Sequence, residues 1–283
     1  MVHDPEVIKK IKETYTTFRK SEKRIADYVL GQPDQVIRHS IAKLSKECNV
    51  SEASVIRFCK AIGCEGFQDF KIQLAMCLIP ASKQIHEDVS FSDPTSEMIH
   101  KVMNSDVQAI IDTMQYLDPK KIDEAISIIS KTKRLELYGV GGSGCVAMDG
   151  QHKFFKLGFS CVAYIDPHMQ AMSASTLKKG DVVIGISHTG FSKDTIDSLR
   201  IAKEAEATTI CITGGIESPI LKYTDIPLIV IAREQVFKPE PMSSRIAQLS
   251  IIDALSIGVA MRKKDRILTN LEKTRKAISS KRY

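Results

Sequence analysis

Tryptophan is absent from this sequence, and aromatic residues make up only 6% of its 283 residues. No uninterrupted apolar run approaches the ~20 residues that a membrane-spanning helix needs. The segment from Met1 to Lys12 is polar and charged, unlike a secretory signal. These absences argue against a membrane or secreted protein and predict a cytosolic location without membrane partners.

The cysteines lack any regular framework. None of the seven belongs to a C-x-x-C pair, and they are scattered through apolar stretches. Disulfide scaffolds and structural metal sites need regular spacings. The pattern therefore predicts reduced intracellular thiols and no metal site for Cys48, Cys59, Cys64, Cys77, Cys145, Cys161 and Cys211.

The formal charge of +6 is only mildly basic and does not by itself indicate nucleic acid binding. Residues 1–80 carry 13 Lys and Arg against 10 Asp and Glu, a net charge of +3. The stretch from Arg262 to Tyr283 is denser, with nine basic residues against Asp265 and Glu272. Its pattern favours a solvated last helix and tail over an arm that contacts DNA.

The length suits two domains of ordinary size. Residues 1–79 show helical periodicity throughout and predict an all-α domain. The periodicity lapses in residues 80–94, where we place a linker. Residues 95–283 begin with two helical stretches, Thr95–Tyr116 and Pro119–Ser130, and then alternate short apolar runs with helical patterns.

The short apolar runs of the second domain predict five strands of a parallel, doubly wound α/β sheet, because strands covered by helices on both faces are almost wholly apolar. Ligands in this architecture bind at the carboxyl ends of strands, near the switch point of the strand order. The loops that follow the strands are therefore the place to look for a site. The predicted strands are Leu135–Val140, Cys161–Ile165, Val182–Ile186, Thr209–Thr213 and Ile226–Ile231.

The segment from Ser40 to Gly63 predicts two short helices joined by a tight turn, a helix-turn-helix. Asn49 tolerates the left-handed conformation that ends a helix. Ser51 stands where an N-cap hydroxyl accepts a backbone N–H, and Val50 and Val55 stand at the positions of a hydrophobic staple. Ser45 is small where the two helices approach each other.

In the second of these helices, Val55, Phe58, Cys59 and Ile62 are predicted to point inward. Such a helix can enter the major groove with its amino end toward the bases, and an arginine can make a bidentate contact with guanine. Arg57 is the first choice for base readout. Lys23 and Arg24, in a preceding helix at Ser21–Leu30, could bind phosphate. The predicted DNA-contacting residues are Ser51, Glu52, Ser54, Arg57 and Lys60; an ordinary helical hairpin with a solvated charged face is the alternative.

A glycine-rich loop follows the first predicted strand. Residues 139–144 read G-V-G-G-S-G, a literal G-x-G-x-x-G before a helical pattern, and Asp166 follows the second strand, where a dinucleotide fold places its ribose-binding acid. An NAD-responsive redox regulator is therefore one hypothesis. Ser143 lies inside the loop, where its hydroxyl could instead meet a smaller ligand.

A second loop favours a phosphorylated ligand. The third strand runs into Ser187-His-Thr-Gly-Phe-Ser192, directly before a helix. Hydroxyls and amides at a helix amino end form a cradle for a phosphate, which the helix dipole also favours. Two such cradles on neighbouring strands suit a small phosphorylated molecule. Helix capping alone would use one or two of these hydroxyls.

Together, the two halves resemble the RpiR family of transcription regulators, in which a helix-turn-helix precedes a sugar isomerase (SIS) domain of flavodoxin-like topology. The resemblance covers nearly the whole chain. It rests on VSEASVIRFCKAIGCEGFQDFK at residues 50–71, on GVGGSG at 139–144, on DVVIGISHTGFSKDT at 181–195 and on SSRIAQLSIIDAL at 243–255.

The resemblance implies that the chain is a DNA-binding regulator whose operator binding responds to a sugar phosphate, and it favours an amino-sugar 6-phosphate. It implies that the phosphate lies against Gly142, Ser143, Ser187, Thr189 and Ser192, with Ser244 or Arg245 closing the site. His188 stands where such domains frequently have a small hydroxylated residue. His152, His168 and Gln170 are further candidates for the pocket.

Similar SIS domains also occur in sugar-phosphate isomerases, where a general acid or base is required. Glu234 and Glu240 lie in a segment that could supply one. Attachment to a DNA-binding module favours a sensor over a catalyst, since a sensor only has to bind its ligand differently in two conformations. We therefore predict no enzymatic activity and no cofactor. A homodimer or homotetramer held by the SIS domains is expected, because helix-turn-helix proteins bind two half-sites as dimers.

Overall fold

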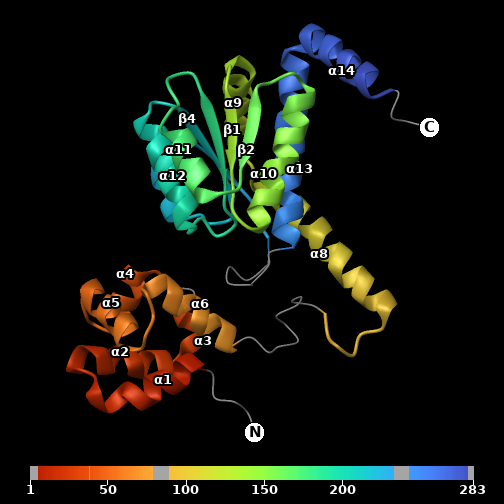
Figure 1. Cartoon of the computed structure of the whole chain (residues 1–283). Coiled ribbons are helices and arrows are strands. Elements are labelled where there is room, and N and C mark those ends of the chain that lie inside the picture. The colour runs from red at the N-terminus through yellow and green to blue at the C-terminus, as the bar shows by residue number, and fades with distance from the viewer. Residues whose placement is uncertain (1–5, 38, 79–88, 233–241, 280–283) are drawn as a thin grey trace. The chain divides into compact units, whose positions relative to one another are not determined.

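The computed structural model describes residues 6–37, 39–78, 89–232 and 242–279, and Figure 1 shows its elements. The chain divides into two compact units, residues 1–98 with 237–239, and residues 99–236 with 240–283. Each unit has its own apolar core. Of the linker that the sequence predicts at residues 80–94, only residues 89–94 lie within the described part.

The first unit is all-helical, as predicted. Its core is aromatic at the centre, where the rings of Phe18, Phe58 and Phe70 pack against one another. Phe58 and Phe70 are fully buried. The elements are α1 (Glu6–Thr14), η1 (Tyr15–Thr17), α2 (Lys20–Gly31), α3 (Pro33–Val36), α4 (Ile41–Glu47), α5 (Glu52–Ala61) and α6 (Phe67–Leu78).

The second unit contains a five-stranded sheet in the order β2-β1-β3-β4-β5, and every neighbouring pair is parallel. This confirms the predicted doubly wound α/β fold. The order is the flavodoxin-like one, whose switch point lies between β1 and β3. The strands are β1 (Leu135–Tyr138), β2 (Cys161–Tyr164), β3 (Val182–Ile186), β4 (Thr208–Thr213) and β5 (Ile226–Ile229).

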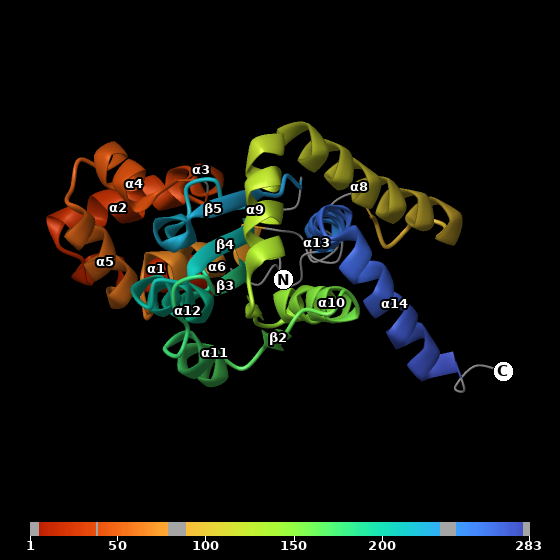
Figure 2. The same ribbon diagram turned by 90° about the horizontal axis from the view of Figure 1, so that it is seen from above.

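Helices cover both faces of the sheet. On one face, α9, α10 and α13 pack against Leu135, Leu137 and their neighbours, and on the other α11, α12 and η2 pack against Tyr138 and Val183. Figure 2 shows α11 and α12 on the side of the strands away from α13. The elements outside the sheet are α8 (Thr95–Tyr116), α9 (Pro119–Lys131), α10 (Gly142–Lys156), α11 (Pro167–Ala174), α12 (Lys193–Glu204), η2 (Pro219–Tyr223), α13 (Ser243–Arg262) and α14 (Lys264–Ile278).

Within the described residues, α13 is the one helix long and apolar enough to cross a membrane by length and hydropathy. Nine of its residues, including Ile251, Ile252 and Leu255, are buried inside the α/β unit. A core helix of a globular domain passes the same test of length and hydropathy. Its burial identifies α13 as such a core helix.

Six cysteines have free thiols, Cys48, Cys59, Cys64, Cys145, Cys161 and Cys211, and all of them but Cys145 are buried. Burial raises the pKa of the Cys59 and Cys161 thiols to about 12. A thiol with a raised pKa has little of the reactive thiolate at neutral pH. Cys145, at the start of α10, is exposed.

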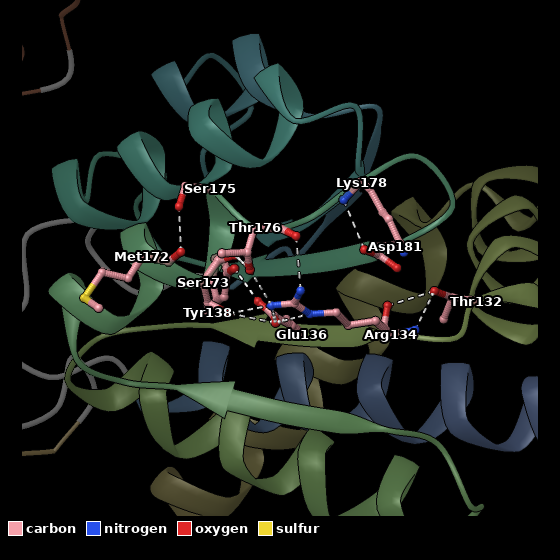
Figure 3. A network of polar contacts seen from close by, with 10 residues as sticks. All are labelled: Thr132, Arg134, Glu136, Tyr138, Met172, Ser173, Ser175, Thr176, Lys178 and Asp181. Atoms are coloured by element: carbon pink, nitrogen blue, oxygen red, sulfur yellow. Dashed lines mark hydrogen bonds and ion pairs between the residues drawn. The ribbon is translucent and has the colours of Figure 1, made fainter.

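A buried polar network joins β1 to α11, on the side of the sheet that faces α12 (Figure 3). Glu136 is 1% exposed, and its Oε1 accepts hydrogen bonds from Arg134 Nε at 2.7 Å and from Ser173 Oγ at 2.8 Å. The Tyr138 hydroxyl donates to Glu136 Oε2 at 2.5 Å, and burial together with this bond raises the tyrosine pKa. Arg134 also donates to Ser173 Oγ and Thr176 Oγ1. The network therefore connects β1, one of the two strands at the switch point, to α11.

Candidate nucleic-acid and ligand sites

The turn between α4 and α5 has the geometry that the sequence predicts. Asn49 takes a φ of 50°, in the left-handed region, and Val50 N donates to Ser45 O at 2.9 Å. Asn49 N donates to Lys46 O, so the two bonds form the Schellman arrangement that ends a helix. Ser51 caps α5, since its side chain accepts from Ser54 N. This confirms a tight helix-turn-helix.

The outer face of α5 carries most of the predicted DNA-contacting residues. Arg57 and Lys60 are exposed, as are Ser51 and Glu52 at the amino end. The inward prediction is confirmed, because Val55, Phe58, Cys59 and Ile62 are buried. Sequence reasoning overlooked Ala53, which is exposed and lies on the same helical face as Lys60. A methyl group at this position suits contact with the methyl group of thymine.

The structure corrects the prediction that Ser54 lies on the DNA-contacting face. Ser54 is 5% exposed and does not lie on the outer face. Its Oγ lies 3.0 Å from Ser51 Oγ and accepts a hydrogen bond from Arg57 NH2 at 2.9 Å. Ser54 therefore orients the Arg57 guanidinium. Since a serine and an arginine three residues apart lie on neighbouring parts of a helix, this pair was visible in the sequence.

Two basic residues of α2 lie beside this motif. Arg24 NH1 donates to Asn49 O at 3.3 Å, so it supports the turn. Lys23 Nζ lies 5.7 Å from the centre of the Tyr15 ring.

Lys71 is the last residue of the run at residues 50–71 that resembles the RpiR family. It is buried, and its Nζ donates to His39 O at 2.8 Å. Its contact is structural and holds α6 against the segment before α4.

The predicted ligand loops meet at the switch point of the sheet. β1 and β3 are hydrogen-bonded neighbours, with Tyr138 opposite Gly185. The first loop leads from β1 into α10, and the second leads from β3 into α12. Two helix amino ends therefore lie at the same edge of the sheet. Their dipoles and unpaired N–H groups both favour an anion there.

The β3 loop is built around the Ser187 hydroxyl. Ser187 is 1% exposed, and its Oγ accepts from Gly190 N and donates to Ser192 Oγ, both at 3.1 Å. Ser192 is the N-cap residue of α12, yet its side chain makes no capping bond. The Ser192 hydroxyl, half-buried, thus receives one hydrogen bond and keeps its own hydrogen for another acceptor. Helix capping does not account for these hydroxyls.

Gly190 is required by the shape of this loop. Its φ of +71° is in the left-handed region, and a Cβ there would lie 2.1 Å from Ser218 Oγ. Thr189 is half-buried, and its Oγ1 accepts from Phe191 N at 3.1 Å. His188 is half-buried, and its carbonyl accepts from Gly214 N at 2.8 Å, which joins the β3 and β4 loops.

The β1 loop brings its backbone close to the start of α10. Gly142 and Ser143 are the first two residues of α10; Gly142 is exposed and Ser143 half-buried. Gly139 has no room for a side chain, because a Cβ would lie 2.6 Å from Ser143 O. Gly141 takes a φ of 55° and turns the chain into the helix.

The amino end of α13 lies level with that of α10. Gly150 and Ile252 are the ninth and tenth residues of their helices, and the Ile252 Cδ1 atom would lie 3.4 Å from a Cβ on Gly150. Asn270 Nδ2, in the helix that follows α13, donates to Leu157 O at the carboxyl end of α10, so α10 and α13 run in the same direction. Ser244 and Arg245, in the first turn of α13, therefore lie at the ligand edge. Ser244 is fully buried and Arg245 half-buried. Glu234 and Glu240 lie outside the described residues.

The three further candidates differ in position, and the structure displaces only His152 from the loops. His152 is exposed on α10, nine residues beyond Ser143 and so about 13 Å along the helix. His168 is exposed on α11. Gln170 is fully buried, and its Nε2 donates to Gly139 O at 3.2 Å and Tyr164 O at 2.8 Å. Gln170 thus connects the carboxyl ends of β1 and β2 and contacts the glycine-rich loop that follows β1.

The side chain of Asp166, the residue considered as a ribose-binding acid, caps a helix instead. Its side chain caps α11 by accepting from Met169 N at 2.9 Å. The strand order is also the flavodoxin-like order and not the 3-2-1-4-5-6 order of the dinucleotide fold. Both observations weigh against an NAD site at the glycine-rich loop.

Comparisons with known proteins match both units. The model described as the helix-turn-helix domain of the rpiR family matches residues 6–80, and the SIS domain model matches residues 128–258. An uncharacterized HTH-type transcriptional regulator of Caldanaerobacter subterraneus is 39% identical over 277 residues, which cover 98% of both chains.

Solved structures share the fold. The Vibrio vulnificus NanR protein, solved in complex with ManNAc-6P, has a TM-score of 0.78 at 21% identity and covers 98% of this chain and 100% of its own. The sugar isomerase domain of an RpiR transcription factor from Sphaerobacter thermophilus has a TM-score of 0.58 at 22% identity. It covers 64% of this chain and 99% of its own.

Proposed function

Because the chain belongs to the rpiR family of helix-turn-helix transcriptional regulators, we propose that it binds operator DNA through α5 and that a phosphorylated sugar controls this binding from the α/β unit. The observation that carries the proposal is the meeting of two helix amino ends, α10 and α12, at the β1–β3 switch point. The regulator acts in the cytosol as a homo-oligomer.

The phosphate lies against the amino ends of both helices. Gly142 and Ser143 offer backbone N–H groups from α10, and Ser192 offers its hydroxyl from α12. Ser187 and Thr189 shape the second loop and polarise its donors. Ser244 and Arg245 face the sugar from α13, and His188 lies beside it. The complex of the Vibrio protein with ManNAc-6P supports an amino-sugar 6-phosphate as the effector.

A thermal-shift screen tests the ligand class. A ligand at 100 times its dissociation constant stabilises the folded state by about 2.7 kcal/mol, which raises the melting temperature of a domain of this size by roughly 5–11 °C. Amino-sugar 6-phosphates should produce such a shift. The same sugars without phosphate, and NAD(H), should not. Stabilisation by NAD(H) alone would reject the sugar-phosphate site in favour of a redox regulator.

We propose that the bound sugar phosphate is an effector and is not turned over. The regulatory relatives support this, whereas the likeness to a sugar isomerase domain keeps an isomerase as the alternative. Incubation of the purified protein with each stabilising sugar phosphate, followed by NMR of the sugar, distinguishes the two. An isomerised product at enzyme-like rates would make the protein a catalyst.

Replacing Arg57 with alanine tests the DNA face. A bidentate arginine–guanine pair contributes about 1–3 kcal/mol of discrimination, so specific operator binding should weaken roughly 5–150-fold. Binding to unrelated DNA should change far less, since it depends on phosphate contacts. Gel-shift titrations at fixed salt measure both, with Lys9→Ala on α1 as a control. An equal loss on both DNAs would show that Arg57 contacts only the backbone.

Ser54→Ala extends the same test. This change removes the hydroxyl that accepts from Arg57 NH2, while the Arg57 side chain itself is retained. We expect a smaller loss of operator discrimination than in Arg57→Ala, and no further loss when both are combined. Additive losses would mean that Ser54 acts independently of Arg57.

A further inference from the structure

Two serines hold the Arg57 side chain at the amino end of α5. Arg57 NH2 donates to Ser54 Oγ at 2.9 Å, and Ser54 Oγ lies 3.0 Å from Ser51 Oγ. Ser51 is the N-cap residue of α5, and Ser54 lies in the first turn and is 5% exposed. This contact agrees with the usual direction of long side chains in helices, which point back toward the amino end. The guanidinium therefore lies level with the first turn of α5, about one turn before its own backbone.

The bond to Ser54 leaves most donors of the guanidinium available for DNA. A guanidinium has five N–H donors, and Ser54 accepts from one of them. Within the described part of the chain, the Arg57 side chain has no further hydrogen bond or ion pair. The second hydrogen of NH2 and those of NH1 can therefore reach two acceptors together, as guanine O6 and N7 require in the major groove. Ser54 thus fixes the position along α5 at which a guanine is bound.

Ala53 presents a methyl group beside this guanidinium. Ala53 is exposed in the first turn of α5, four residues before Arg57, and residues four apart lie on the same face of a helix. A helix turns by about 100° per residue, so Arg57 stands between Ala53 and Ser54 around the helix axis. Because the bond to Ser54 draws the guanidinium back by a turn, the methyl group and the guanidinium lie at the same level of α5.

The methyl group of Ala53 favours one base in the major groove. Thymine presents a 5-methyl group there, whereas the edges of the other bases present hydrogen-bond donors and acceptors. Opposite a methyl group, a donor or acceptor of a base would lose its water without gaining a hydrogen bond. Two methyl groups in contact instead remove apolar surface from water. Ala53 therefore selects a thymine over the other three bases.

We infer that each operator half-site carries a guanine bound by Arg57 and, at the neighbouring base pair, a thymine whose methyl group packs against Ala53. Two side chains at one level of a helix meet neighbouring base pairs, which are stacked about 3.4 Å apart. Without the bond to Ser54, the long Arg57 side chain could reach base pairs further along the groove. Either strand can supply the thymine. This inference rests on the proposed operator binding through α5.

Selection of duplexes from a random pool by the full chain tests the predicted sequence. We expect the enriched half-sites to contain a guanine with a thymine at the adjacent base pair. Ser54→Ala should enrich the same two bases at variable spacing, because the guanidinium is released. A spacing as uniform as that of the wild type would overturn the positioning by Ser54. Half-sites without a thymine beside the guanine would reject this inference alone, whereas a chain that enriches no sequence would reject the proposed operator binding as well.

Replacing the thymine with deoxyuridine removes only the methyl group and tests the contact with Ala53. Burial of one such group changes affinity about fourfold, so gel shifts should show about fourfold weaker binding of the deoxyuridine duplex by the wild type. Ala53→Gly should bind both duplexes equally, and comparing each variant with itself cancels any general loss of affinity. Ala61→Gly, at an exposed alanine at the other end of α5, should keep the fourfold difference. The same penalty in Ala53→Gly as in the wild type, or none in the wild type, would overturn the contact.

Discussion

Replacing Ser187 with alanine is expected to weaken sugar-phosphate binding about 10–100-fold and to remove the effector's influence on operator binding. The Ser187 hydroxyl donates to Ser192 Oγ, and a hydroxyl that already accepts a hydrogen bond is a stronger donor to the next acceptor. A hydrogen bond to a charged group contributes about 1.5–3 kcal/mol, or roughly 13–160-fold in affinity. Ser187 acts through Ser192, so the expected loss lies somewhat below that range. The loop itself should survive, because Gly190 N also donates to Ser187 O at 3.2 Å.

Isothermal titration of the sugar phosphate that emerges from the thermal-shift screen measures the loss directly. Gel shifts without the sugar should show the operator affinity of the wild type, since the DNA-binding helix belongs to the other unit. Ser160→Ala is the matched control, because Ser160 is an exposed serine immediately before β2, at the opposite edge of the sheet. Wild-type affinity in Ser187→Ala would count against this placement of the phosphate.

A double-mutant cycle separates direct from indirect contact. Ser192→Ala should weaken binding at least as much as Ser187→Ala, since Ser192 is the residue that we propose donates to the phosphate. The double variant should lose little more than Ser192→Ala alone, because both hydroxyls act through one chain of hydrogen bonds. Fully additive losses would indicate that each serine contacts the ligand separately.

Replacing Glu136 with alanine is expected to destabilise the α/β unit by about 3 kcal/mol. Removing one partner of a buried ion pair leaves the other charge uncompensated and costs about 3–5 kcal/mol. The lower end applies here, because the Arg134 side chain is 35% exposed and water can partly solvate it. Ser173 and Tyr138 would also lose their acceptor. The melting temperature should fall by roughly 6–12 °C.

Urea unfolding followed by circular dichroism checks this expectation. Glu217→Ala, at an exposed acidic residue of the same unit, should change the free energy of unfolding by less than about 0.5 kcal/mol. Glu136→Gln keeps the shape and one acceptor oxygen for Tyr138, so its loss should be intermediate. A Glu136→Ala variant as stable as Glu217→Ala would mean that the network contributes nothing net.

Features that depend on a few consecutive residues could be predicted before the structure was known. Asn49 and Ser51 specify the turn of the helix-turn-helix through a left-handed residue and an N-cap, which need no distant partner. The five apolar runs specify strands buried on both faces, and their alternation with helical patterns leaves a parallel sheet as the simplest solution. The glycine-rich and serine-rich loops follow strands for the same local reason.

Contacts between residues distant in sequence could be identified from the folded chain alone. Gln170 supports the first loop and Glu136 accepts from Ser173, because α11 folds back over β1. His152 was placed near the pocket by its helix, but the length of α10 carries it away. The exposure of Met103, Val107 and Met114 on α8 could not be recognised either, because an apolar stripe looks the same in a sequence whether its own domain covers it or leaves it exposed. Burial is a property of the packed chain, and periodicity reports only which side of a helix is apolar.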